Sequence, residues 1–313
     1  MTATLVTGAA GFLGAHLTRR LLDAGDHVVA LDNYRTGRPA ALAPLRAKNP
    51  DTLGIVRHDV TIPYMAEVDR VFHLACPASP RHYQRDPVTT VRTSVVGTDN
   101  MLALARALDV PLVFTSTSEV YGNPHVIPQP ESYWGNVNPV GPRACYDEGK
   151  RAAETLCYEY RAQYDTDTRI ARLFNTYGPG LSPGDGRVVS TFIDAALAGR
   201  PLVVHGDGLQ TRSLCYVDDT VDALLLLGDA SAHTPGVAGP INVGSPADRT
   251  TMLGLAHLIV ELTGSASPIV FVDRPRDDPD HRQPDITRAA TVLGWAPTTP
   301  LDEGLSRTID AFA

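Results

Sequence analysis

Tyr146 and Lys150 are the residues whose types and spacing most directly indicate chemistry. They lie four positions apart, and Lys150 is one of only two lysines in a chain that otherwise uses arginine. Residues i and i+4 share one face of a helix, so the ammonium group is expected to lie beside the phenol. A nearby positive charge favours the phenolate and lowers a tyrosine pKa from about 10. The pair is therefore predicted to take a proton from a substrate hydroxyl near neutral pH.

A glycine-rich segment near the N-terminus indicates a nucleotide site. Residues 4–7 predict a short buried strand, residues 8–14 read Gly-Ala-Ala-Gly-Phe-Leu-Gly, and residues 15–24 predict a helix. Strand, glycine turn and helix in this order are the context of a dinucleotide-binding fingerprint. The glycines allow close approach of the backbone to a pyrophosphate, and the helix N-terminus offers free amide hydrogens to that anion.

The residues that follow the next two predicted strands refine this prediction. Asp32 and Asn33 come directly after the strand predicted at residues 27–31. A carboxylate there accepts hydrogen bonds from the ribose hydroxyls of adenosine and repels a 2′-phosphate, which favours NAD over NADP. Arg35 and Arg38 are a counter-argument because they could bind such a phosphate. Asp59-Val60 follows the third predicted strand and is placed to meet the adenine.

Composition and charge exclude several classes of protein. The chain has 313 residues, 43% of them hydrophobic, which suffices for one large core and a smaller lobe. A net charge of −8 without a lysine/arginine stripe makes nucleic acid an unexpected partner. No run of eighteen apolar residues predicts a membrane span, and no export signal is recognised. Cysteines without Cys-x-x-Cys spacing then indicate reduced thiols in the cytoplasm, and the histidine spacing predicts no metal site.

The hydrophobic pattern predicts a Rossmann-type α/β fold. Strands are expected at residues 52–56, 70–75, 111–116 and 168–173, with helices at 87–108 and 146–164. This alternation indicates a doubly wound parallel sheet with helices on both faces. We expect residues 1–175 to form this domain and residues 176–313 a smaller C-terminal α/β substrate lobe, from which some segments return to the large domain. Residues 178–187 are rich in glycine and proline and predict a loop over a ligand.

The two motifs together resemble the extended short-chain dehydrogenase/reductase superfamily, which carries Gly-x-x-Gly-x-x-Gly and the catalytic pair Tyr-x-x-x-Lys. Residues 117–119, Thr-Ser-Glu, discriminate within it. Nucleotide-sugar 4,6-dehydratases carry Asp-Glu at the last two positions, and Ser118 is a poor acid for that chemistry. Ser-Glu resembles the UDP-glucuronate decarboxylases, as do residues 77–80, 133–150 and 277–286. This resemblance covers the chain from about Thr4 to Phe312.

The resemblance implies decarboxylation of UDP-glucuronate to UDP-xylose through a 4-keto intermediate, with the NAD cofactor regenerated in each turnover. Tyr146 is the expected base, Lys150 lowers the pKa of its phenol, and Thr117 orients the 4-oxygen. Ser118 and Glu119 position the ring, and a protonated Glu119 or its water is expected to protonate C5. Arg282 is expected to bind the substrate carboxylate through two hydrogen bonds from its guanidinium group.

The resemblance also implies the binding residues. The cofactor-binding set is Gly8, Gly11, Phe12, Leu13, Gly14, Asp32, Asn33, Thr36, Gly37, Asp59, Val60, Leu74, Thr93, Tyr146 and Lys150. The UDP-sugar is expected at Ser79, Asn175, Arg187, Gln210, Arg212 and Arg282. Relatives commonly dimerise through two helices of each subunit, here residues 88–108 and 146–164, which predicts a homodimer.

Three alternatives remain open from the sequence. Gly180 stands where relatives commonly have arginine, and Cys76 where they often have serine or alanine. The enzyme could therefore release the 4-keto pentose as a major product. A 4,6-dehydratase is a second possibility, disfavoured by Ser118. A non-catalytic NAD-binding scaffold is the third, although such proteins typically lose the tyrosine/lysine pair.

Overall fold

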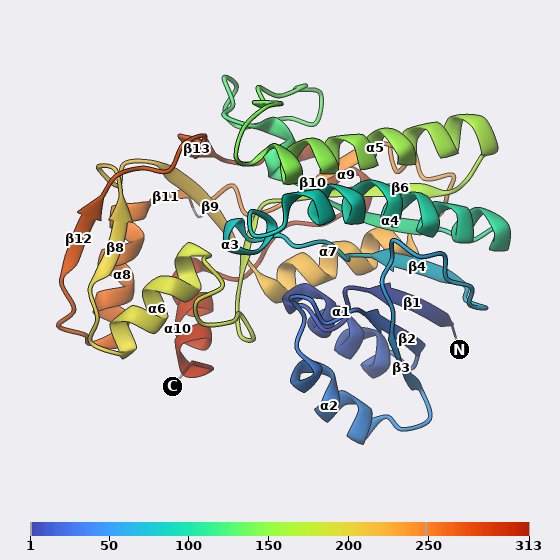
Figure 1. The fold of residues 1–313 in the computed structure, drawn as a ribbon, viewed down its shortest axis with the longest axis horizontal. Coiled ribbons are helices and arrows are strands. Elements are labelled where there is room, and N and C mark those ends of the chain that lie inside the picture. The colour runs from blue at the N-terminus through green and yellow to red at the C-terminus, as the bar shows by residue number, and fades with distance from the viewer. Residues whose placement is uncertain (1, 248, 313) are drawn as a thin grey trace.

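A seven-stranded sheet forms the centre of the computed structural model, which describes residues 2–247 and 249–312 (Figure 1). The strand order is β10-β6-β5-β4-β1-β2-β3, and every neighbouring pair is parallel. The strands are β1 (Ala3–Thr7), β2 (His27–Asp32), β3 (Leu53–Arg57), β4 (Arg70–His73), β5 (Leu112–Thr117), β6 (Thr168–Leu173) and β10 (Pro240–Val243). The predicted fold class, a Rossmann-type parallel sheet, is confirmed.

Helices cover both faces of this sheet, as a parallel sheet requires. One face carries α1 (Phe12–Asp23), α2 (Pro39–Lys48) and α7 (Val217–Asp229), and the other carries the paired helices α4 (Pro87–Leu108) and α5 (Ala144–Tyr164) (Figure 1). The short helices α3 (Pro80–Tyr83) and η1 (Ser118–Tyr121) follow β4 and β5 and lie near the cleft.

Local sequence explains where these elements begin and end. Helix α4 starts after Asp86, whose side chain accepts a hydrogen bond from the Thr89 amide, and it ends at Asp109 in the left-handed conformation. The predictions of residues 87–108 and 168–173 match α4 and β6. Helix α1 begins at Phe12, earlier than predicted, because Gly11 is its N-cap. Strand β4 ends at His73, earlier than predicted, because Ala75 turns its amide to the Thr7 hydroxyl and borders the cleft.

The second half of the chain builds a smaller lobe and also returns to the large sheet. Strand β10 pairs with β6, while α7 and α9 (Thr287–Leu293) pack beside it. The smaller lobe contains β7 (Asn175–Tyr177), β8 (Leu202–His205), β9 (Thr211–Tyr216), β11 (Arg249–Thr251), β12 (Ile269–Val272), β13 (His281–Arg282), α6 (Val188–Leu197), α8 (Met252–Thr263) and α10 (Leu301–Asp310). In Figure 1 this lobe occupies the left side.

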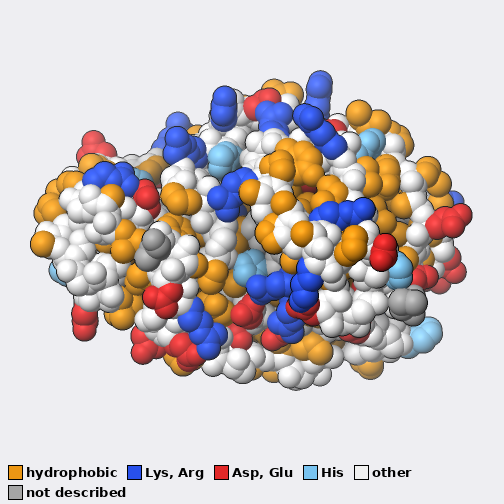
Figure 2. Space-filling model, turned by 90° about the horizontal axis from the view of Figure 1, so that it is seen from below, with side chains coloured by type: hydrophobic (Ala, Val, Ile, Leu, Met, Phe, Trp, Pro, Cys, Tyr) orange, Lys and Arg blue, Asp and Glu red, His pale blue; other side chains and the backbone are white. Residues whose placement is uncertain are grey.

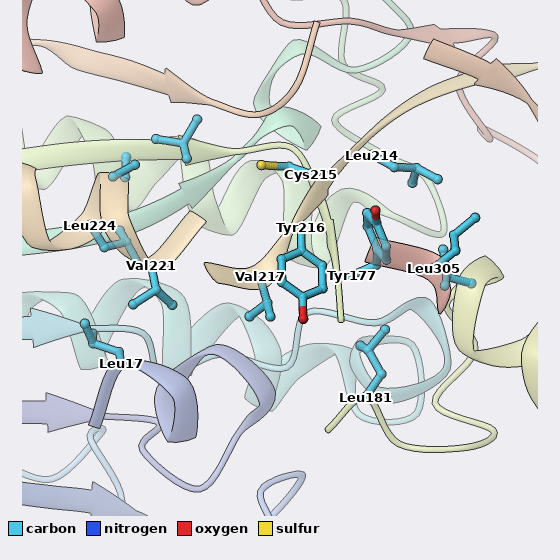
Figure 3. Close-up of a cluster of buried hydrophobic side chains, with 14 of the residues drawn as sticks. Leu17, Tyr177, Leu181, Leu214, Cys215, Tyr216, Val217, Val221, Leu224 and Leu305 are labelled. Carbon is cyan, nitrogen blue, oxygen red and sulfur yellow. The ribbon is translucent and has the colours of Figure 1, made fainter. Parts of the chain in front are cut away.

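One hydrophobic cluster joins the two lobes (Figure 3). Leu17 of α1, Val221 and Leu224 of α7, and Leu305 of α10 are fully buried and belong to the same cluster. Because interiors pack as densely as organic crystals, a shared core of this kind holds the lobes in a fixed relation. The sites on the two sides of the intervening cleft are therefore held at defined separations. Within the described ranges, no helix is long and apolar enough to cross a membrane.

Candidate functional site

A cleft of about 970 Å³ lies where the carboxyl ends of β1, β2, β4, β5 and β6 meet the smaller lobe. Ligands of open α/β sheets bind at this edge. Figure 2 shows several arginine or lysine side chains across the middle of one face, with acidic side chains among them. Of the residues predicted for catalysis, cofactor and substrate, all except Gly37 and Asp59 line this cleft.

The glycine turn after β1 forms a cradle that side chains would fill. Gly8 has φ +70°, and a Cβ there would lie 2.9 Å from the Ala75 backbone. A Cβ on Gly14 would lie 2.7 Å from Ala9 Cα and well inside van der Waals contact of the Gly8 carbonyl oxygen. Only glycine permits this approach of turn, helix α1 and strand β4. The residues therefore fit a dinucleotide pyrophosphate at the N-terminus of α1.

Asp32 closes this cofactor half of the cleft. Its carboxylate accepts hydrogen bonds from the Ala10 amide at 2.9 Å and the Tyr34 amide at 2.7 Å. Burial raises its pKa, and these two amides oppose that shift. Gly37 packs against the same carboxylate. The carboxylate is thus fixed at the end of β2, where it can meet a ribose.

Asp59, which lies outside the cleft wall, and two arginines complete the cofactor half. Asp59 accepts a hydrogen bond from the Asn33 side chain at 2.9 Å, so it supports Asn33 from behind. Arg35 pairs with Asp86, and Arg38 donates to the Gly180 carbonyl at 3.2 Å. Both arginines already have partners, which weakens the argument that they bind a 2′-phosphate.

Tyr146 and Lys150 project from the first two turns of α5 into the cleft. The ring of Tyr146 stacks on Tyr83 with a centroid distance of 5.1 Å, and Lys150 Nζ donates to the Thr115 carbonyl at 2.7 Å. Burial raises the pKa of Tyr146, whereas a hydrogen bond with Thr117 lowers it. Burial likewise lowers the pKa of Lys150. The spacing predicted that Lys150 lowers the tyrosine pKa, but burial raises it in this structure, and the opposing effects come from Thr117 and Arg187 rather than from the ammonium group.

The sugar half of the cleft contains a buried cluster of charges. Glu119 of η1 forms a bidentate ion pair with Arg282 of β13 and a second pair with Arg143 at 2.7 Å. Burial raises the pKa of Glu119, but the two guanidinium groups outweigh it and hold this pKa far below its usual range. This pairing favours ionised Glu119 and disfavours a protonated Glu119 as the donor to C5, whereas donation by its water stays a prediction.

This cluster also changes the expectation for Arg282. Its two terminal nitrogens face Glu119, and one of them lies 3.5 Å from the Ser118 hydroxyl. A substrate carboxylate must therefore approach an arginine that is already paired. Arg143, which the sequence did not single out, supplies the additional positive charge.

The remaining predicted substrate residues lie in the same cleft. Arg212 pairs with Asp278 at 3.0 Å, and the Arg187 guanidinium lies 3.6 Å from Asp185. Gln210 donates to the His205 carbonyl at 2.9 Å, while its buried Oε1 has no partner among the described residues. Ser79 donates to the Asp185 carbonyl, and Asn175 lines the cleft at the start of β7.

The predicted loop of residues 178–187 lies against the large lobe. His16 shares a hydrogen bond of 2.7 Å with the Pro179 carbonyl, and Arg38 and Arg81 donate to the carbonyls of Gly180 and Gly184. The large lobe thus supplies the side chains and the loop supplies backbone acceptors. Within residues 2–247 and 249–312, no group of three or more His, Cys, Asp or Glu side chains could hold a metal ion.

With this geometry, comparison with known families is decisive. The NAD dependent epimerase/dehydratase family matches residues 4–244. The chain belongs to this family. Among its relatives, UDP-glucuronic acid decarboxylase 3 of Arabidopsis thaliana is 50% identical over 302 residues, which cover 96% of this chain and 86% of the relative. UDP-glucuronic acid decarboxylase 1 of Xenopus tropicalis is 47% identical over 308 residues, which cover 98% and 71%.

Solved structures of other epimerase/dehydratase proteins share the whole fold. UDP-glucuronic acid 4-epimerase from Bacillus cereus, in complex with UDP-glucuronic acid and NAD, has a TM-score of 0.85 at 26% identity, covering 99% of this chain and 98% of its own. A dTDP-glucose 4,6-dehydratase from Streptomyces venezuelae, solved with NAD bound, has a TM-score of 0.87 at 26% identity, covering 99% and 96%. The glycine cradle and Asp32 are thus the residues expected to hold NAD in this family.

Proposed function

We propose that this protein is an NAD-dependent UDP-glucuronate decarboxylase that forms UDP-xylose. Relatives with that name match nearly the whole chain at 47–50% identity. The observation that carries the proposal is the position of Tyr146, Thr117 and Lys150 in one cleft with a buried cluster of two arginines and Glu119. A proton-transfer group and an excess of positive charge suit a sugar that bears a carboxylate.

The chain's own residues divide the chemistry between them. NAD held by the glycine turn and Asp32 would supply the acceptor for the hydride of C4 and the donor for its return. Tyr146 takes the proton of the 4-hydroxyl during oxidation and gives it back during reduction, and Thr117 orients the 4-oxygen. Lys150 lies on the same face of α5, where its ammonium favours the phenolate form of Tyr146 that accepts this proton. The 4-ketone accepts the electrons left by carbon dioxide, so no further group is required.

Arg143 and Arg282 hold the substrate carboxylate until it leaves. Ionised Glu119 pairs with both guanidinium groups and does not donate a proton. The proton that C5 gains must therefore come from water or another acid. Ser118 is 2% exposed and its hydroxyl faces Arg282, an arrangement that lacks the acid a 4,6-dehydratase needs for a leaving hydroxyl.

Release of the 4-keto pentose is a second outcome, favoured by Gly180. This residue has φ +90° in the loop of residues 178–187, and a Cβ there would lie 3.6 Å from His16 and 4.0 Å from Phe12. A side chain at this position would cover the N-terminus of α1. Its absence leaves the cofactor half less enclosed.

We also propose a homodimer formed through α4 and α5. Val88 and Val91 of α4 and Tyr158 of α5 are 61%, 39% and 66% exposed on these neighbouring helices. Apolar side chains exposed on a helix pair favour burial against a second pair. Sedimentation velocity of the wild type and of Tyr158→Glu tests this proposal. A wild type that sediments as a monomer at micromolar concentration contradicts it.

The function is tested by incubation with UDP-glucuronate and catalytic NAD, followed by NMR of the sugar and absorbance of NADH. UDP-xylose without accumulated NADH is the expected result. A 4-keto pentose with accumulating NADH would instead support the second outcome. No change in UDP-glucuronate, together with turnover of a dTDP-hexose, would replace the proposal with a dehydratase.

A further inference from the structure

Asp147 is a buried carboxyl group to which the proposed mechanism gives no role. It follows Tyr146 in the first turn of α5, and it is 5% exposed. Its Oδ1 has no hydrogen-bond partner among the described residues. An ionised carboxylate without a partner is costly in such a place, so the side chain either takes a proton or acquires a counter-ion.

An arginine one turn before Asp147, at the N-cap of α5, is directed elsewhere. Arg143 lies one turn earlier, since the Asp147 amide donates to the Arg143 carbonyl at 3.1 Å, and i, i+4 residues share a helix face. The Arg143 guanidinium nevertheless pairs with Glu119 at 2.7 Å. The Nε atoms of Arg143 and Arg282 and the Tyr83 hydroxyl also lack partners among the described residues. Several polar atoms around this cluster therefore have no hydrogen-bond partner among the described residues.

The charged and titratable groups around Asp147 come from four elements. Burial and Glu119 of η1 raise its pKa to about 8, against the opposing effect of Arg143 and of Arg282 on β13. Glu148 on α5 adds to the rise but is itself half-exposed, with Arg151 3.5 Å away. Tyr83 of α3 and Cys145 of α5 are also nearby, and burial raises the pKa of each. Neither is charged at neutral pH.

The charge of the cluster then depends on one proton. Arg143 and Arg282 contribute two positive charges and Glu119 one negative charge, while Arg212 is balanced by Asp278. With Asp147 neutral, one positive charge is left over. With Asp147 ionised, no positive charge is left over within this cluster, so a substrate carboxylate beside it would be compensated less well in a region of low dielectric constant.

We propose that Asp147 determines specificity for a carboxylated sugar by carrying a proton. The neutral side chain leaves one arginine charge for the substrate carboxylate, and its ionisation neutralises the cluster and weakens that binding. Asp147 does not line the cleft, so it acts through Arg143 and Arg282. When UDP-glucuronate binds at alkaline pH, Asp147 takes up one proton from solvent. The inference rests on the proposed function only for the identity of the sugar.

The experiment measures binding in the holoenzyme of Tyr146→Phe, which blocks turnover. UDP-glucuronate affinity is expected to fall about tenfold between pH 7 and pH 9, because the neutral fraction of Asp147 falls by that factor around a pKa of about 8. UDP-xylose shares the uridine and diphosphate but has no carboxylate, so its affinity should stay constant. Adding Asp147→Asn should remove the pH dependence for UDP-glucuronate and keep the tight affinity at pH 9.

A matched control is Glu148→Gln, which removes the neighbouring half-exposed carboxylate from the same helix. In this variant the affinity for UDP-glucuronate should still fall about tenfold between pH 7 and pH 9. The inference is overturned by an equal fall in the Asp147→Asn variant, by an equal fall for UDP-xylose, or by no fall in the parent.

Calorimetry in buffers of different ionisation enthalpy provides a measurement that needs no substitution at Asp147. Binding of UDP-glucuronate at pH 9 should take up about one proton per site, and binding of UDP-xylose none. Equal proton uptake for both ligands would overturn the inference even if Asp147→Asn did not fold. Intact pH-dependent binding without decarboxylation by the wild type would remove the proposed function and leave the inference standing.

Discussion

The cofactor half of the cleft is built from backbone geometry, whereas the sugar half is built from paired charged side chains. In the first, Gly8 and Gly14 allow close approach, and one carboxylate, Asp32, is held by amides. In the second, Glu119 and Arg282 come from η1 and β13, 163 residues apart in the chain. A glycine turn in close contact with other backbone is disrupted by an added side chain. A buried cluster of ion pairs is disrupted by a change in its net charge. The two halves should therefore fail differently when altered.

The largest effect is expected where the two halves meet, at Tyr146. Tyr146→Phe removes the phenolic hydroxyl that exchanges the proton and should lower kcat by about 10³-fold or more, while NAD stays bound. The rate of UDP-glucuronate consumption and the NAD content of the purified protein measure the two parts. Tyr160→Phe is the matched control, because Tyr160 lies on the same helix but outside the cleft. Its hydroxyl donates a hydrogen bond of 2.7 Å to Asp99. Near-normal turnover by Tyr146→Phe would refute the assigned role.

A change of balance in the sugar half should show as a stability defect that depends on pH. Glu119→Gln leaves one buried and one largely buried arginine, Arg282 and Arg143, without a counter-charge and should cost about 3 kcal/mol at pH 7. The folded pKa of Glu119 is depressed, so its contribution is present above the unfolded value and is lost as pH falls. Urea denaturation at pH 7 and pH 4 should show a smaller deficit at the lower pH.

The control for Glu119→Gln is Glu159→Gln, an exposed acid on α5. It should change the free energy of unfolding by less than about 0.5 kcal/mol. A constant deficit for Glu119→Gln at both pH values would mean that the side chain acts by packing rather than by charge.

An added methyl group should damage the cofactor half without any change of charge. Gly14→Ala places a Cβ 2.7 Å from Ala9 Cα, so the turn or α1 must shift, at a cost of about 2 kcal/mol. NAD affinity should fall with it, and thermal denaturation with and without NAD measures both effects. Gly54→Ala is the control, since its Cβ would meet only the Val28 carbonyl oxygen at 3.9 Å. Equal stability and equal NAD affinity of the two variants would contradict the role of Gly14 in the close approach of turn and helix.

The smallest effect is expected from the carboxylate at the ribose end. Asp32→Ala removes the acceptor of the Ala10 and Tyr34 amides and should weaken NAD binding about tenfold, with a smaller loss for NADP. The ratio of the two dissociation constants should therefore narrow. Asp23→Ala, an exposed residue 3.5 Å from Lys48, should leave the ratio unchanged. A ratio that does not change in Asp32→Ala would show that discrimination lies elsewhere in the cleft.

The cofactor half could be predicted from the sequence because its residues are close together along the chain. The turn at residues 8–14 and Asp32 belong to one strand–helix–strand unit, in which hydrophobic period and glycine spacing specify the geometry. The boundaries were less certain, and α1 begins three residues earlier than predicted because Gly11 serves as its N-cap. Helix α4 was predicted to the residue, since Pro87 and Asp109 mark its two ends.

The sugar half could be predicted only in part. Glu119 and Arg282 were identified through the resemblance, but their direct pairing was not, because no local pattern relates η1 to β13. Arg143 and Asp147 were not singled out, although both stand within the recognised segment of residues 133–150. Their importance follows from burial next to Glu119, which only the folded chain establishes.

The sequence by itself therefore determined the sheet, the dinucleotide turn and the Tyr146/Lys150 pair, because each depends on the spacing of residues that are close together in the sequence. Tertiary structure decided the protonation states. Burial raises the pKa of Tyr146 against the expectation from its lysine and raises the pKa of Asp147, while two arginines hold the pKa of Glu119 far below its usual range. Desolvation and charge pairing depend on which distant segments meet, and that information is spread over the whole chain.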